Sequence, residues 1–154
     1  MKTGGIRMTM IEEIAARQEL KQLVDTYANE SDKNNQDYYV NVFTEDCRVR
    51  VYFNGELGMD LKNVHDLIAA YKGFGAAKAA FHMNGQQTVA FEDETHATGT
   101  CYALAHLVNE KDGADMLTTH AVRYEDRYVK TADGWRVAAR KQYFMFSDTH
   151  ALGK

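Results

Sequence analysis

The chain has 154 residues, 45% of them hydrophobic, and its 18 Lys and Arg against 22 Asp and Glu leave a net charge of −4. A chain of this length can bury about two thirds of its unfolded surface, so one domain can form without a metal or a disulfide. Acidic and basic residues are interspersed and form no basic stripe, which argues against a nucleic-acid partner.

Cellular location and metal content can be addressed from composition. No run of about 20 apolar residues could span a bilayer, and the start, MKTGGIRMTM, lacks the apolar stretch of a secretory signal. We therefore expect a soluble, cytoplasmic protein without a membrane partner. Cys47 and Cys101 have no CxxC spacing and the six histidines form no HxH or HxxxH pair, so we expect buried thiols and no metal.

The first half of the chain predicts helices followed by a strand. We expect a flexible leader over residues 1–9, a single domain over 10–148 and a tail over 149–154. Apolar residues at offsets of three and four predict an amphipathic helix from Met10 to about Ser31. The polar stretch SDKNNQD separates it from a second short helix over 38–43. Alternating apolar residues then predict a strand over 47–53, ended by an Asn-Gly turn.

The second half predicts a sheet. A third helix is expected over 61–71, before the small-residue loop GFGAAKAA. Period-two runs separated by turn sequences predict strands over 88–91, 100–108, 117–130 and 135–146, joined as an antiparallel meander. Helices followed by strands imply an α+β fold, in which the helices close one face of a cone-shaped, curved antiparallel or mixed sheet. The apolar floor of such a cone can hold a small ligand.

This order of elements, together with the ending YEDRYVKTADGWRVAARKQY, resembles the SnoaL-like branch of the nuclear transport factor 2-like superfamily, which has a cystatin-like fold. The resemblance covers residues 11–147. The superfamily contains dehydratases, isomerases, cyclases, hydrolases and non-catalytic modules, so the fold alone leaves the activity open.

Within that branch, FHMNGQQTVAFEDETHATG resembles a segment of bile-acid 7-alpha-dehydratases and, more distantly, of scytalone dehydratase and the lindane dehydrochlorinase. In those lyases an Asp just past the first helix and a His that opens this strand form a catalytic dyad. The resemblance assigns these roles to Asp32 and His82. It also matches Tyr27, five residues before the Asp, and approximately Tyr52, just before Asn-Gly, to tyrosines of the bile-acid enzymes.

Near the carboxyl end the sequence departs from the bile-acid dehydratases. Where the bile-acid dehydratases carry an Arg in the last strand, an ungapped comparison places Phe144. Arg140 occupies a position that resembles an active-site Arg of the dehydrochlorinase. The resemblance therefore implies elimination chemistry more firmly than a steroid-acid substrate.

Asp and His suit an elimination of water because the reaction needs a base for a carbon-bound proton and an acid for the departing hydroxyl. The unperturbed pKa of histidine, about 6.5, lies near working pH. A carboxylate bonded to the second ring nitrogen fixes the tautomer and stabilises the imidazolium. The alternatives are that Asp32 is a solvated connector residue and that His82 is structural.

Spacing restricts how the site can be built. Tyr27 and Asp32 are five residues apart, about 140° around an ideal helix, so we expect the helix to stop near Glu30 or Ser31 and Asp32 to turn inward. Tyr27 then either donates a hydrogen bond to a substrate oxygen or is an ordinary residue of the apolar face.

The remaining candidate substrate contacts are Tyr52, Arg140, His106 and Phe144. Tyr52 alternates onto the same strand face as two arginines, which are costly beside an apolar pocket. Either a bulge shifts the register or Tyr52 faces a subunit interface. Arg140 can bind a substrate carboxylate or pair with an acidic residue such as Asp126. His106 and, equally, His120 are strand histidines that could line a pocket.

We therefore expect a cofactor-independent lyase that acts on a small, mostly apolar, hydroxylated ring compound. His82 would remove a proton, Asp32 would orient His82, and Tyr27 would stabilise an oxygen, with or without Tyr52. A ketosteroid-isomerase type is disfavoured, because Val51 stands where that class has its carboxylate base. The non-enzyme alternative is a ligand-binding or assembly module, as in beta subunits of ring-hydroxylating dioxygenases.

Self-association is also expected, because the outer apolar face of the long strands must be covered. The resembled lyases imply a homo-oligomer, with a trimer favoured and a dimer possible.

Overall fold

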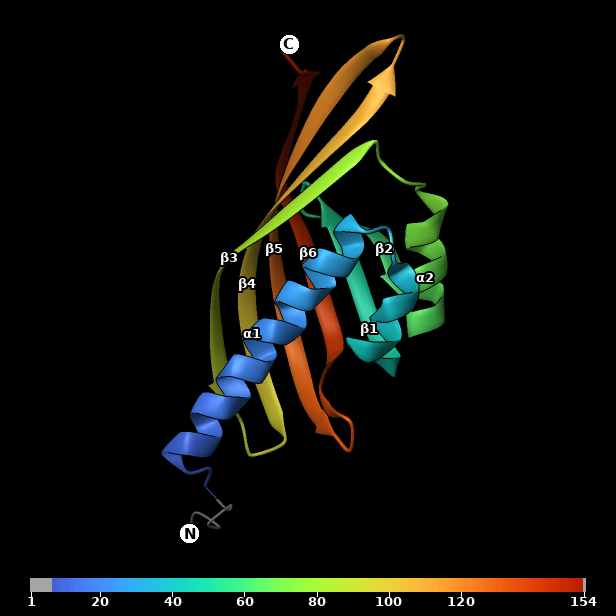
Figure 1. Ribbon diagram of the computed structural model, residues 1–154. Coiled ribbons are helices and arrows are strands. Elements are labelled where there is room, and N and C mark those ends of the chain that lie inside the picture. The colour runs from blue at the N-terminus through green and yellow to red at the C-terminus, as the bar shows by residue number, and fades with distance from the viewer. Residues whose placement is uncertain (1–6, 154) are drawn as a thin grey trace.

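The computed structural model describes residues 7–153. Three helical segments and six strands follow one another: α1 (Met10–Asp32), the 3-10 helix η1 (Gln36–Asn41), β1 (Phe43–Phe53), β2 (Glu56–Leu61), α2 (Val64–Gly73), β3 (Ala79–Phe91), β4 (His96–Lys111), β5 (Ala114–Thr131) and β6 (Gly134–Ala151). Figure 1 shows α1 lying across one face of the sheet, with η1 and α2 beside β1 and β2. Most of the expected leader, residues 1–6, lies outside the described residues.

The six strands form one open, mixed sheet in the order β2-β1-β6-β5-β4-β3. Strands β3 to β6 form the expected antiparallel meander. The exception is β1, which pairs with β6 in parallel. The predicted α+β fold with a mixed sheet is therefore confirmed, and the parallel pair joins the amino-terminal half of the chain to the last strand.

Several element boundaries differ from those expected. Residues 56–61 form β2, so the third helix begins at Val64 and not at Leu61. Strand β3 begins at Ala79, inside the stretch expected to be a loop, and β6 runs past Phe146 into the expected tail, as far as Ala151. In each case pairing with a neighbouring strand extends the ladder over residues whose own β-propensity is weak.

Helix α1 begins with a capping box, in which the Thr9 side chain accepts from the Glu12 backbone and the Glu12 carboxylate accepts from the Thr9 backbone. Its buried face recurs at offsets of three and four and packs on β3 and β6 (Ala16, Leu20, Val24, Tyr27). This packing holds the end of α1, where Asp32 lies, over the sheet. No helix within residues 7–153 is long and apolar enough to cross a membrane.

The hydrophobic core lies between α1 and the inner face of the sheet. Strand β1 contributes Cys47, Val49 and Val51, all buried, as its period-two pattern predicted. Both cysteines are buried free thiols, also as expected. Burial raises the pKa of the Cys47 thiol to about 11, with the Asp46 carboxylate acting in the same direction.

Gly99 in β4 occupies a site of close approach. A Cβ atom there would lie 2.7 Å from Cε2 of Tyr128 and 2.9 Å from the backbone oxygen of Thr88. We expect Gly99→Ala to lower the free energy of unfolding by about 1–3 kcal/mol, measured by urea denaturation, because the backbone must shift. The control is Gly85→Ala, whose nearest new contact would be an ordinary 3.6 Å. Equal losses in the two variants would contradict the prediction.

Candidate active site

A cavity of about 420 Å³ lies between the end of α1, η1, α2 and the inner face of the sheet. Aromatic rings make up much of its wall: Tyr27, Tyr39, Phe53, Tyr71, Phe74, Tyr124 and Phe144. Its polar side chains are Ser31, Asp32, Asn34, Gln36, His82, Asn109, His120 and Gln142. The cavity thus combines an apolar volume with a few polar groups, as is typical of small-molecule sites.

The chain turns sharply where Asp32 enters this cavity. Asp32 is the last residue of α1, and Asn34, two residues later, has a φ of 56°, in the left-handed region that Asn tolerates. The helix therefore runs through Asp32, one or two residues beyond the predicted end near Glu30 or Ser31. Asp32 and Tyr27 nevertheless both line the cavity, although they lie on the same helix.

The Asp32 carboxylate holds His82 at two points. Oδ2 of Asp32 accepts a 2.9 Å hydrogen bond from the His82 backbone N–H, and Oδ1 lies 2.5 Å from Nδ1 of the imidazole. The side chains of Asp32 and His82 are 25% and 18% exposed, so a ligand in the cavity can reach a pair that is otherwise shielded. The two residues are fifty positions apart in the chain, and α1 and β3 bring them together.

This contact fixes how the imidazole can react. With a carboxylate on Nδ1, the ring carries its proton there, and Nε2 is left as the proton acceptor. A base oriented by a carboxylate is the arrangement that proton abstraction requires.

Tyr27 forms part of the aromatic floor of the cavity. It is 5% exposed, and its ring centroid lies 4.9 Å from that of Tyr39 and 6.3 Å from that of Tyr124. Burial raises the pKa of the Tyr27 phenol above its usual value, while the Arg140 guanidinium acts in the opposite direction. The phenol is therefore neutral near pH 7 and can donate a hydrogen bond.

His120, in β5, is a cavity residue that the sequence did not single out from the other strand histidines. Its Nδ1 lies 2.6 Å from Oγ of Ser147, and its ring packs edge-on against Phe144 with centroids 5.0 Å apart. It shares its strand face with Val122 and Tyr124, but alternation does not show which face lines the cavity, so no signal in the sequence separated it from His106. Burial, and then the charge of His82, lower the pKa of His120.

The lowered pKa of His120 predicts a pH dependence of stability. The unfolded chain, with a histidine pKa of about 6.5, takes up this proton before the folded protein does, so the contribution is present above about pH 6.5 and lost as pH falls toward the folded pKa. We expect His120→Asn to lose less Tm than the parent between about pH 7.5 and pH 5. His65→Asn, at an exposed position, is the control and should keep the parental slope. Identical slopes for His120→Asn and parent would contradict this prediction.

Phe144 lines the cavity, but Tyr52 does not. Phe144 stacks on Phe53, with centroids 4.8 Å apart. Tyr52 lies on the outer face of the sheet, where it stacks on Tyr143 at 4.8 Å. A bulge does occur between Val51 and Tyr52, but it shifts the pairing with β2 and leaves Phe53, not Tyr52, in the cavity wall. The expectation of a substrate contact by Tyr52 is therefore corrected.

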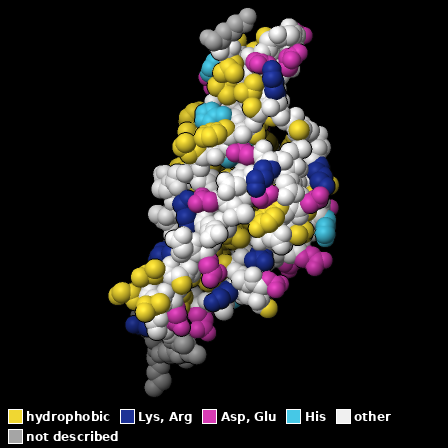
Figure 2. Space-filling view, in the orientation of Figure 1, with side chains coloured by type: hydrophobic (Ala, Val, Ile, Leu, Met, Phe, Trp, Pro, Cys, Tyr) yellow, Lys and Arg dark blue, Asp and Glu magenta, His cyan; other side chains and the backbone are white. Residues whose placement is uncertain are grey.

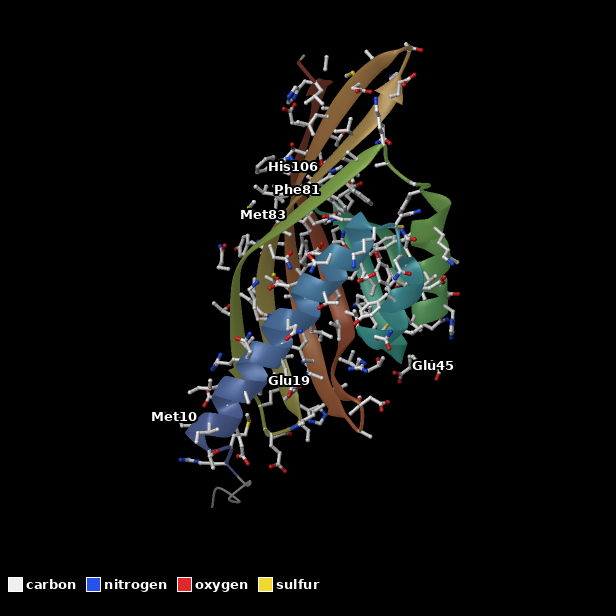
Figure 3. All side chains as sticks on the ribbon, in the orientation of Figure 1. Met10, Glu19, Glu45, Phe81, Met83 and His106 are labelled. Atoms are coloured by element: carbon white, nitrogen blue, oxygen red, sulfur yellow. The ribbon has the colours of Figure 1, made fainter. Side chains whose placement is uncertain are left out.

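His106 also faces away from the cavity. Its Nδ1 lies 2.9 Å from Oγ1 of Thr119, and its ring is 6.3 Å from that of Phe81. Figure 3 shows His106, Phe81 and Met83 together on neighbouring strands. Strand alternation in β4 puts Ala105 and Leu107 into the cavity and His106 on the other face. The expected contact of His106 with a substrate is corrected accordingly.

Arg140 lies beneath the cavity and not in its wall. Its Nε and Nη2 donate 2.7 Å and 2.9 Å hydrogen bonds to the Asp126 carboxylate, and both side chains are almost completely buried. Because it is buried and bound to Asp126, the guanidinium cannot contact a ligand in the cavity. Of the two alternatives from the sequence, the structure places Arg140 in the ion pair with Asp126, which corrects its assignment as a substrate contact.

Two further features bear on the type of site. Among the described residues, no group of three or more His, Cys, Asp and Glu is arranged to hold a metal ion.

A second groove, of about 520 Å³, lies on the outer face of the sheet. It is lined partly by Arg48, Arg50, Arg127 and Lys141, and contains neither His82 nor Asp32. The inner cavity is therefore the candidate active site.

One family model matches most of the chain, and several solved structures are similar in fold. The family model for the SnoaL-like domain matches residues 12–141, whereas no curated protein matches the chain. A scytalone dehydratase-like protein from Novosphingobium aromaticivorans is 18% identical, with 94% of each chain covered and a TM-score of 0.80. The Kfla4162 protein from Kribbella flavida is 26% identical, with 88% of this chain and 95% of that chain covered and a TM-score of 0.74.

A third similar structure is the hexachlorocyclohexane dehydrochlorinase LinA-type3 from Novosphingobium barchaimii. It is 12% identical, with 94% of this chain and 95% of that chain covered and a TM-score of 0.73. At such identities these structures establish a shared fold.

Proposed function

The chain belongs to the SnoaL-like domain family, and from this premise we propose that it is a cofactor-independent lyase that eliminates water from a small, hydroxylated, mostly apolar ring compound. Lyase-type activity fits the family and the dehydratase and dehydrochlorinase names of similar structures. The observation that carries the proposal is the Asp32–His82 pair, with Nε2 of His82 available inside an aromatic cavity.

The proposed reaction balances within the site. Nε2 of His82 removes a proton from a carbon next to a carbonyl, the electron pair forms the carbon–carbon double bond, and the β-carbon–oxygen bond breaks. The imidazolium, stabilised by Asp32, returns the proton to the departing hydroxyl, which leaves as water. One proton enters and leaves His82, so no cofactor is needed.

Two further side chains can stabilise the oxygens of the substrate. The neutral phenol of Tyr27 is positioned to donate to the carbonyl oxygen as negative charge develops there. His120 lies in register with His82 on the same sheet, with Ala105 of β4 between them, and can hydrogen-bond the departing hydroxyl. Both act where charge changes during the reaction.

The charges around the cavity restrict the substrate. Among the described residues that line it there is no Lys or Arg, and the carboxylate of Asp32 is present. An anionic substrate would bury its charge without a partner, which is costly. We therefore propose an uncharged substrate, and Phe144 and the buried Arg140 give no support to a steroid acid.

A panel of uncharged cyclic β-hydroxy ketones tests the proposal. Formation of the conjugated enone is followed by ultraviolet absorbance with purified protein and, in parallel, with His82→Gln. Turnover of at least one compound that disappears in the variant is the expected result. Thermal stabilisation by panel members without any turnover would instead favour the ligand-binding alternative.

We also propose that the outer face of the sheet is covered by further copies of the chain. Phe81, Met83, Tyr102 and Leu104 are each 41–55% exposed there, on the neighbouring strands β3 and β4. Figure 2 shows hydrophobic side chains grouped beside a histidine in the upper part of the molecule. Burying such a group in a homo-oligomer removes apolar area from water. The resemblance to trimeric lyases favours a trimer over a dimer.

Light scattering coupled to size-exclusion chromatography measures the mass of the assembly. We expect an oligomer for the parent and a monomer for Leu104→Lys, because a buried, unpaired ammonium opposes association. Ile11→Lys, at a residue 80% exposed on α1, is the matched control and should leave the mass unchanged. A monomeric parent would refute the proposal.

A further inference from the structure

The two charges of the Asp126–Arg140 ion pair beneath the cavity have different surroundings. The Asp126 carboxylate accepts from Arg140 and from the Tyr128 hydroxyl, at 3.0 Å, and that hydroxyl accepts from Nε2 of Gln87 at 3.2 Å. Tyr124 lines the cavity, whereas Gln87, Asp126 and Tyr128 are not among its lining residues. The negative end of the pair is thus bound among polar groups.

The positive end faces aromatic rings. The guanidinium carbon of Arg140 lies 3.9 Å from the ring centroid of Tyr124, 4.9 Å from that of Tyr27 and 5.4 Å from that of Phe43. Nη1 of Arg140 is buried and has no hydrogen-bond partner among the described residues. The cation is therefore held largely by ring faces, and two of these rings form the cavity floor.

We propose that Arg140 is a positioning residue: from beneath the floor, and through the Tyr27 phenol, it lowers the free-energy cost of negative charge that develops on a bound oxygen. The inference rests on the proposed elimination only for its catalytic consequence. It requires no contact between Arg140 and the ligand, which the buried ion pair would prevent.

Two physical effects allow the charge of Arg140 to act on a bound oxygen without contact. A fixed charge in a water-excluded site is poorly screened, so it acts over the width of a ring. A nearby cation also makes a phenol a stronger hydrogen-bond donor, because it favours charge on the phenol oxygen. Asp126 cancels part of this field, but the Arg140 guanidinium affects the pKa of the Tyr27 phenol more than the Asp126 carboxylate does.

A probe that needs no substrate tests the inference. The two protonation states of 4-nitrophenol have different absorbance, so the dissociation constants of the neutral and ionised forms can be measured separately. In the charge-free variant Arg140→Met/Asp126→Leu, we expect the ratio of the two affinities to shift about tenfold against the ionised form, whichever form the parent binds more tightly. The matched control, Arg48→Met/Asp60→Leu, removes the same groups from an exposed pair on the outer face and should not change the ratio.

A second variant keeps the test decisive if the buried double variant does not fold. Tyr27→Phe retains the ion pair but removes the phenol, so it should produce a similar shift of the ratio. Combining Tyr27→Phe with the double variant should add little, because both changes remove one coupled interaction. An unchanged ratio in either variant would overturn the inference.

Kinetics separate this inference from the proposed function. With an active substrate, the double variant should lower kcat about tenfold with KM within about twofold, because the interaction strengthens in the transition state. Equal losses in kcat for the outer-face control would indicate a general structural effect and refute the assignment. If no substrate is turned over, the proposed function fails, whereas the nitrophenol ratios still decide the inference.

Discussion

The His82→Gln variant is expected to lower kcat by about 10²–10⁴-fold, because glutamine cannot accept the carbon-bound proton that Nε2 of His82 removes. Asp32→Asn should cause a loss of similar size for another reason. An amide donates to Nδ1, so the imidazole proton moves to Nε2 and blocks the base. Both are measured as enone formation with the best compound of the panel.

A second His–Asp pair provides matched controls. His96 and Asp93 lie 3.0 Å apart, exposed, where the turn after β3 meets the start of β4, and neither lines the cavity. His96→Gln and Asp93→Asn make the same chemical changes and should retain parental turnover. Parental activity in His82→Gln or Asp32→Asn would eliminate the proposed pair as the catalytic centre.

A measurement without substrate can examine the same contact. The imidazole N–H of His82 should give a downfield proton resonance, because it donates a short hydrogen bond to Asp32. The resonance should disappear in Asp32→Asn and remain in Asp93→Asn. Its persistence in Asp32→Asn would show that the Nδ1 proton does not bind this carboxylate.

Arg140→Met is expected to lower the free energy of unfolding by about 3–5 kcal/mol, the largest effect on stability predicted for a single substitution in this protein. The reason is that Asp126, whose side chain is 0% exposed, would remain as a buried charge without its cation. Chemical denaturation, with the midpoint and slope both reported, measures the loss.

Removing both charges should cost much less than removing one. Arg140→Met/Asp126→Leu leaves no unpaired charge, and apolar replacements of a buried ion pair are often neutral in stability. Arg48→Met removes a cation from an exposed pair and should cost no more than about 1 kcal/mol, since exposed pairs contribute little. A double variant as unstable as Arg140→Met would show that packing, and not charge, dominates at this position.

Features that depend on local periodicity could be predicted from the order of the amino acids. Offsets of three and four predicted α1, and the polar stretch after it predicted the end of the helix to within one or two residues of Asp32. Alternation in β1 correctly separated Val49 and Val51 from Arg48 and Arg50. These predictions held because side-chain direction within one helix or strand follows from the backbone repeat.

The tertiary structure alone decided which distant segments meet. Period two shows that a strand has two faces but not which one covers the core, so His106 and His120 were equivalent until the sheet placed only His120 in the cavity. Likewise, the parallel pairing of β1 with β6 and the Asp126–Arg140 contact depend on register between strands. Register is set by the packing of the whole sheet and its bulges, a sum over many contacts that no local stretch of sequence contains.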